Sequence, residues 1–105
     1  MSKIPRNDWT GSINGSVYTT ASSDAITPAT GNVFVAITML SDTVFDAASG
    51  LVAESATAYV NTEGVGAGSN GLVVDSVTFP KGCTIYGRWT EIDVSSGTIV
   101  AYQGS

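Results

Sequence analysis

The sequence predicts an all-β fold: a small antiparallel β-sandwich or barrel, for which a jelly roll is one allowed arrangement. Short runs of β-branched and aromatic residues recur along the chain, and clusters of Gly, Ser, Asn and Pro separate them. Only 12% of the 105 residues are charged, and Ser, Thr, Gly and Asn take their place. This length is that of one domain. We therefore expect one β domain over residues 11–105, preceded by a flexible N-terminal arm over residues 1–10.

The N-terminal arm holds half of the basic residues of the chain. Lys3 and Arg6 precede Trp9, and only two further basic residues face the acids of the remainder. These charges either make a flexible end soluble or dock the arm on an acidic partner, and both interpretations stay open here. Residues 10–20 alternate loosely between apolar and polar positions and contain two glycines, which predicts a short hairpin.

The middle of the chain contains the clearest strand. Residues 21–32 have loop chemistry and end in Gly-Asn. Residues 33–40 are β-branched and aromatic at both alternate positions, which predicts a central strand covered on both faces. Residues 43–45 are expected to form another strand. Residues 47–58 contain several alanines but are broken by Ser-Gly, so a turn and a strand are favoured over a helix, and residues 57–60 return to β character.

Four glycines mark residues 61–71 as a flexible, exposed loop. Their spacing is not a dinucleotide fingerprint, because that site needs a helix after the loop and residues 72–74 have strand character. We expect a strand over residues 72–79, a turn over residues 80–82, and another strand over residues 83–86.

Gly87 interrupts the next apolar run, where a bulge or bend would fit. Residues 88–94 then alternate strictly, which places Trp89 with Glu91 and Asp93 on one face and Ile92 on the other. A turn over residues 95–97 and a closing strand over residues 98–102 complete the expected fold.

The direction of Trp89 is open at this point. If the alternation holds, Trp89 points outward beside two acids, where it would anchor a protein interface or stack on a sugar ring. If Gly87 shifts the phase, Trp89 belongs to the core.

The residues offer little chemistry for catalysis. The chain has no histidine, which leaves the single Cys83 without a base and makes a buried packing thiol its expected role. The carboxylate pairs Asp42/Asp46 and Glu91/Asp93 lie among turn or surface positions and are expected to be solvated. We expect no enzyme activity, no cofactor and no metal. The net charge of −5 argues against nucleic acid as a partner, and no apolar run is long enough to cross a membrane.

Several phrases of the sequence resemble a family of small virion structural proteins of tailed bacteriophages, of the type found in marine and cyanobacterial phages. The resemblance is carried by Thr43-Val44-Phe45, Phe79-Pro80-x-Gly82, Thr84-Ile85-Tyr86-Gly87-Arg88-Trp89, and Ser96-Gly97-Thr98-Ile99-Val100-Ala101-Tyr102. It extends over residues 33–102 and is strongest after residue 78.

The resemblance implies a β-rich, non-enzymatic protein that decorates or cements the phage head. Its partner would be the major capsid protein or a tail protein, and its place the exterior of the capsid after assembly in the host cytoplasm. A homo-oligomer, with a trimer favoured, would gain affinity from multivalent binding. The alternative is a tail or head-fibre adhesion module that binds host-surface glycans through Tyr86 and Trp89. From the residues themselves, the interface candidates are Lys3, Arg6, Trp9, Tyr86, Arg88 and Trp89.

Overall fold

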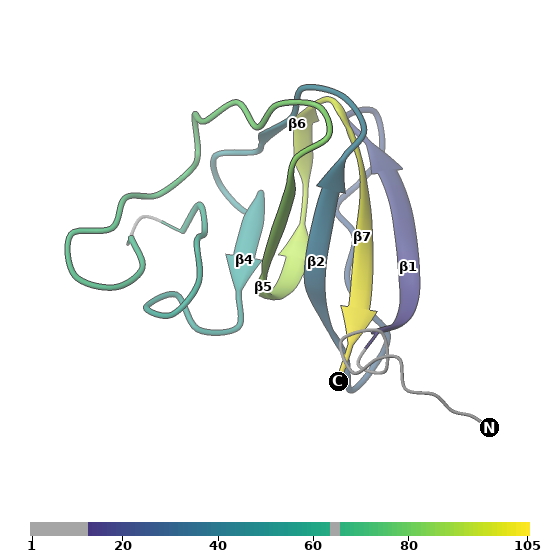
Figure 1. Ribbon diagram of the computed structural model, residues 1–105, viewed down its shortest axis with the longest axis horizontal. Coiled ribbons are helices and arrows are strands. Elements are labelled where there is room, and N and C mark those ends of the chain that lie inside the picture. Colours follow the sequence, from purple (N-terminus) through teal and green to yellow (C-terminus); the bar gives the residue numbers. More distant parts are fainter. Residues whose placement is uncertain (1–12, 64–65) are drawn as a thin grey trace.

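The computed structural model describes residues 13–63 and 66–105, and all regular structure within them is β. Two antiparallel sheets make up the fold (Figure 1). This confirms the all-β prediction. Neither sheet closes on itself within the described residues, so the barrel or sandwich form is not confirmed. Lys3, Arg6, Trp9 and the expected arm over residues 1–10 lie outside the described residues.

A five-stranded sheet has the order β1-β7-β2-β5-β4, and a two-stranded sheet pairs β3 with β6. The strands are β1 (Ile13–Thr20), β2 (Val33–Met39), β3 (Val44–Phe45), β4 (Leu51–Ala53), β5 (Thr84–Ile92), β6 (Val94–Ser96) and β7 (Thr98–Gly104).

β2 is the central strand of the larger sheet, as its sequence predicts. It pairs antiparallel with β5 on one side and with β7 on the other. Five of its seven residues are buried, which agrees with apolar side chains at both alternate positions. A second layer of the fold covers one face of β2, whereas a hollow lies over Ala36 and Thr38 on the other, so the expected cover is present on one face only.

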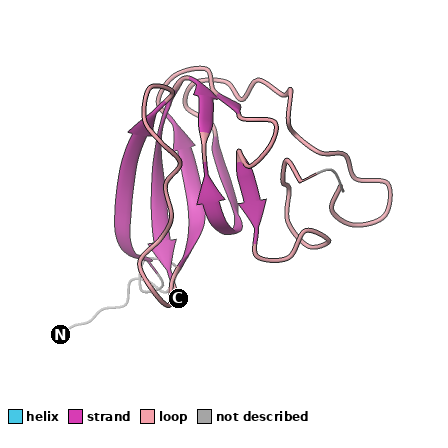
Figure 2. Cartoon of the chain, turned by 180° about the vertical axis from the view of Figure 1, so that it is seen from behind, coloured by secondary structure: helices cyan, strands magenta, loops and turns pink. Residues whose placement is uncertain are grey.

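The core lies between one face of the five-stranded sheet and a second layer. That layer contains Phe45 of β3, Val94 of β6 and the loop over residues 21–32, which runs down this face in Figure 2. Within the loop, Ile26 forms an isolated bridge with Ile92 of β5 and packs on the core. The buried cluster consists of Phe34, Ile37, Met39, Phe45, Leu51, Trp89, Ile92, Val94, Ile99 and Ala101.

Three predicted elements differ from the structure. The described part of the expected hairpin is one strand, β1, with a register irregularity between Ile13 and Gly15. Residues 72–79 form no strand, although Phe79 makes an isolated bridge with Thr43. Leu72 is 82% exposed. Residues 57–60 form no strand either: they comprise a turn, a bend and an irregular residue. In both segments the residues have β character, but no neighbouring strand is available to pair with them, and pairing is what stabilises a strand.

The loop that starts at Asn61 is not exposed throughout, because Asn61 and Thr62 are buried. The Asn61 amide nitrogen donates to the carbonyls of Ala56 at 3.0 Å and Tyr59 at 2.9 Å, and its oxygen accepts from the Glu63 amide at 2.8 Å. One buried side chain thus folds the preceding turn onto the sheet. Such a satisfied buried amide is a structural feature that glycine content alone does not reveal.

Trp89 lies in the core, with no exposed surface. The expectation that Trp89 shares a face with Glu91 and Asp93 is wrong, because β5 has an extra residue at Thr90. The register shows this bulge: adjacent residues of β4, Val52 and Ala53, pair with Glu91 and Trp89, which are two positions apart. The bulge changes the phase between Trp89 and Ile92, so both point inward. A second register shift lies where a bend was expected, between Tyr86 and Trp89 opposite β2.

Candidate functional site

The face of the five-stranded sheet opposite the core carries two rows of side chains. In the first row, Tyr18 of β1 pairs with Val100 of β7, which pairs with Thr38 of β2 and then Thr84 of β5. In the second row, the order is Ser16, Tyr102, Ala36 and Tyr86. Their neighbours along each strand include Val17, Ile37, Ile85 and Ala101, which pack on the core. Side chains alternate between faces, so the eight residues share the outer face.

Three of the four tyrosines of the chain lie in these rows. Tyr18 is 65% exposed and Tyr86 is 76% exposed, while Tyr102 between them is half-buried. We call the eight residues the tyrosine face: Ser16, Tyr18, Ala36, Thr38, Thr84, Tyr86, Val100 and Tyr102.

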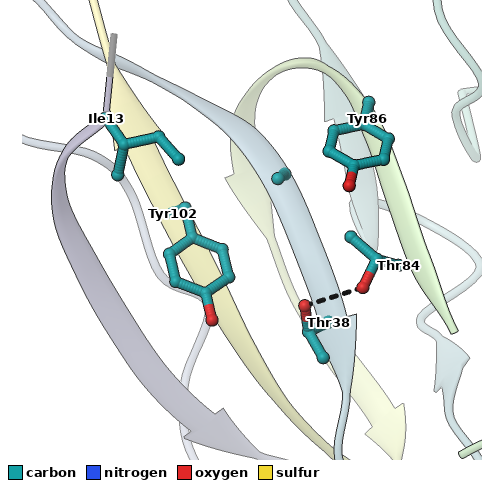
Figure 3. Close-up of a pocket in the computed structure, with 6 residues that line it drawn as sticks. Ile13, Thr38, Thr84, Tyr86 and Tyr102 are labelled. Carbon is teal, nitrogen blue, oxygen red and sulfur yellow. Dashed lines mark hydrogen bonds between the residues drawn. The ribbon is translucent and has the colours of Figure 1, made fainter. Parts of the chain in front are cut away.

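A hollow of about 280 Å³ lies on the tyrosine face over β2. Figure 3 shows Tyr86 and Tyr102 on either side of it, with Ile13 at one end. The small Ala36 separates the two tyrosines in their row, which leaves the space between their rings. The hydroxyls of Thr38 and Thr84 lie 2.9 Å apart and hydrogen-bond to each other. The hollow therefore has aromatic walls and a polar floor at one end.

None of the eight residues of the tyrosine face is charged. Exposed tyrosine rings are costly to hydrate, and a contiguous group of them on a small domain is typical of a binding surface. The hydroxyls remain available as directional hydrogen-bond donors and acceptors. This arrangement suits recognition of a protein or sugar surface.

The candidate residues Tyr86 and Arg88 have different environments in the structure. Tyr86 lies on the tyrosine face. Arg88, two residues further along β5, already makes a two-pronged contact with Glu54, with Nε at 2.6 Å from Oε1 and a terminal nitrogen at 3.3 Å from Oε2. Its other terminal nitrogen donates to the carbonyl of Ser105 at 3.0 Å. The hydrogen bond from Arg88 lowers the pKa of Glu54, and the same bond raises the pKa of Arg88.

Trp89 has no surface with which to bind a partner. Its indole nitrogen donates to the carbonyl of Val60 at 2.8 Å, which ties the turn after β4 to the sheet. Of the two interpretations open from the sequence, the core position is the one observed.

Acidic side chains gather where β5 ends. Burial raises the pKa of Asp93, and the nearby carboxylate of Asp46 adds to the effect through repulsion and a side-chain hydrogen bond. Within residues 13–63 and 66–105, no three or more acidic or cysteine side chains are grouped so as to hold a metal ion.

The sequence reasoning missed most of the tyrosine face. Tyr18, Tyr102, Thr38 and Thr84 were not among the candidates, although the alternation in β7 carries the signal. Ile99 and Ala101 are buried, whereas the alternate residues Val100 and Tyr102 are partly exposed. With the core phase of one strand known, the antiparallel register places the outer residues of its neighbours.

The described residues form no helix long and apolar enough to span a bilayer. Comparisons with protein-family models, with curated proteins and with solved structures found no match for this chain.

Proposed function

We propose that this protein is a non-enzymatic structural protein of a tailed-phage virion, which decorates and stabilises the head. The observation that carries the proposal is the tyrosine face: an exposed, uncharged group of aromatic side chains on a rigid sheet. Tyrosines are favoured at protein interfaces because they bury a large area at little cost in side-chain entropy. The sequence resemblance to phage structural proteins supplies the identity of the partner.

In this proposal the tyrosine face binds the major capsid protein, or a tail protein, on the exterior of the virion. Many copies assemble in the host cytoplasm, and self-association, with a trimer favoured, raises affinity because several weak contacts are made at once. The low content of charged residues supports close association of copies, since few like charges oppose it.

Tyr86 and Tyr102 provide the test. Heads of the encoding phage that lack the protein are mixed with the wild-type chain or with the double variant Tyr86→Ser/Tyr102→Ser, and bound protein is measured after sedimentation. We expect the double variant to lose at least about tenfold in affinity, because two aromatic anchors are removed. The matched control is Tyr59→Ser, which removes a tyrosine in the turn after β4 and is expected to bind normally. Equal binding by all three proteins would contradict the proposal.

A second candidate function is glycan binding, and the hollow is the observation that favours it. Aromatic rings on two sides and threonine hydroxyls on the floor are suited to stacking and hydrogen bonding of one sugar ring. This function predicts that the wild-type chain binds host-surface glycans, that Tyr86→Ser abolishes that binding, and that heads are not bound at all.

A further inference from the structure

The two edges of the five-stranded sheet differ in how they are protected. At the β4 edge, the strand has three residues, and Thr62 occupies its outer side: the Thr62 amide donates to the Leu51 carbonyl at 3.0 Å, and its hydroxyl accepts from the Leu51 amide at 3.0 Å. At the β1 edge, the strand has eight residues without Pro or charge, and among the described residues it pairs with β7 alone. Long uncharged edges of this kind are templates for pairing with another strand.

We infer that the β1 edge pairs antiparallel with β1 of a second copy about a two-fold axis, which joins two five-stranded sheets into one. The inference concerns the self-association included in the proposed function, but it assigns a two-fold dimer in place of the trimer favoured there. It rests on the backbone geometry of β1 and not on the virion role, so the two are tested separately.

The hydrogen bonds of the sheet show which backbone groups of β1 face outward. The Ala21 amide donates to the Gly97 carbonyl at 3.1 Å, and this pair continues the β1–β7 register. In an antiparallel pair, alternate residues direct both their N–H and their C=O to the same neighbour. Val17 and Thr19 therefore bond to β7 like Ala21, whereas Ser16, Tyr18 and Thr20 direct their groups to the open side.

Among the described residues, two of these three have no backbone partner on the open side. The Thr20 carbonyl is used by the Ser23 amide at 3.1 Å in the turn that follows. No hydrogen bond joins the N–H or C=O of Ser16 or Tyr18 to another described residue on the open side. The edge therefore presents two donors and two acceptors, spaced for one more strand.

This arrangement is self-complementary. If Val17 lies on the two-fold axis opposite Val17 of the second copy, Ser16 lies opposite Tyr18 of the second copy, and Tyr18 opposite Ser16. Each of the two outer pairs then exchanges both hydrogen bonds, and every open group of Ser16 and Tyr18 is satisfied. The half-buried Val17 side chains meet on the core side of the joined sheet.

The self-complementary register favours a second copy as the occupant, and charge permits it. Each chain has a net charge of −5, but β1 contains no charged residue to oppose its equivalent. Side chains keep their face when sheets join edge to edge. The tyrosine faces of both copies would therefore become one continuous surface, with both Tyr18 side chains near its centre.

The test uses the full chain and the variant Ser16→Pro. Proline removes the N–H that faces the open side and leaves the β1–β7 hydrogen bonds, a position that edge strands tolerate. Sedimentation equilibrium from about 1 μM to 1 mM measures the dimer. We expect a dimer for the wild type and for the control Ser16→Val, which keeps the N–H, and at least about a tenfold higher dissociation constant for Ser16→Pro. A monomeric wild type, a trimer, or a Ser16→Pro chain that dimerises like the wild type would overturn the inference.

Amide hydrogen exchange of the wild type gives a second readout, should Ser16→Pro fail to fold. The amides of Ser16 and Tyr18 are expected to be protected at high protein concentration and to exchange rapidly on dilution. Protection that persists in the monomer would assign the edge to another segment of the same chain and contradict a second copy. A normal wild-type dimer together with unchanged head binding by Tyr86→Ser/Tyr102→Ser would remove the proposed function and leave this inference standing, whereas a monomeric wild type would remove this inference alone.

Discussion

Trp89 and Tyr86 lie three residues apart on one strand and have opposite environments. Trp89 has no exposed surface and donates a hydrogen bond into the turn after β4, whereas Tyr86 is 76% exposed beside a hollow. Both are large aromatic residues of the same strand, and only the phase of the strand separates them. The comparison shows that in this protein one face of the sheet packs in the core and the other carries exposed aromatic side chains.

The inward or outward direction of Trp89 follows from the first part of β5 and not from its last residues. Ile85 packs on the core, so Tyr86 points outward and Trp89, at an odd spacing from Tyr86, points inward. The extra residue at Thr90 then returns Ile92 to the core. Counting backward from Ile92 without the bulge reverses the direction of Trp89, which is how the sequence expectation failed.

Trp89→Ala tests the buried side of the comparison, and we expect it to lower the stability of the fold more than the other variants do. It removes the largest buried side chain and its hydrogen bond to Val60. Replacements of this kind cost about 3–5 kcal/mol, a large part of the stability of a small domain. Urea unfolding followed by circular dichroism measures the loss. A cost near that of a surface substitution would contradict the core position, and Trp89→Phe should cost less because the ring is partly retained.

Gly87→Ala tests how closely the indole packs on the strand. A Cβ at Gly87 would approach the six-membered ring of Trp89 to 2.7 Å, so the ring must shift. Such overpacking costs about 1–3 kcal/mol. The same unfolding experiment applies, with Gly31→Ala as a control whose Cβ meets nothing within 4 Å. Because Gly31 has φ of +88°, this variant measures backbone strain without a steric clash, whereas Gly87 has no positive φ. Unchanged stability of Gly87→Ala would contradict the steric argument.

Asp93→Asn tests a partly buried acid just after the end of β5, and its expected effect on stability is the smallest of the three variants. Burial and Asp46 raise the pKa of Asp93, so the folded state binds its proton more tightly than the unfolded state does. Stability is therefore expected to fall as the pH rises from the ordinary Asp range through the raised folded pKa, with the full penalty above it. At pH 7 the variant should be more stable by about 0.5 kcal/mol, the size of a like-charge repulsion across strands.

The difference between Asp93→Asn and the wild type should disappear below the ordinary pKa of an aspartate, where both side chains are neutral. Thermal unfolding at a series of pH values measures it. A stabilisation that is independent of pH would show that the carboxylate charge is not the cause.

The sequence indicated the fold class and the central position of β2 correctly, because β-branched and aromatic residues at both alternate positions are favoured in the middle of a sheet. The expected cover on both faces was wrong, since a hollow lies over Ala36 and Thr38.

The turn at Gly82 was also predicted, and this glycine has positive φ. The turn expected over residues 95–97 is confined to Gly97, because Ser95 and Ser96 belong to β6. Leu72 and its neighbours were mistaken for a strand because β character does not show whether a partner strand exists. Asn61 was expected in an exposed loop, since its buried hydrogen bonds join residues whose proximity only the folded chain creates.

The candidate site was only partly predictable. Tyr86 was recognised, but the tyrosine face depends on the register of β1, β7, β2 and β5, which brings together residues up to 86 positions apart. Trp89 was open between two positions because one bulged residue decides its direction.

The reactivity of the four tyrosines toward a small oxidising reagent, compared between the free protein and the assembled virion, tests the central claim most directly. Tyr18, Tyr86 and Tyr102 are expected to become protected together in the virion, because the tyrosine face is covered by its partner. Tyr59, in the turn after β4, should react equally in both states. Unchanged reactivity of the three face tyrosines in virions that contain the protein would contradict the account.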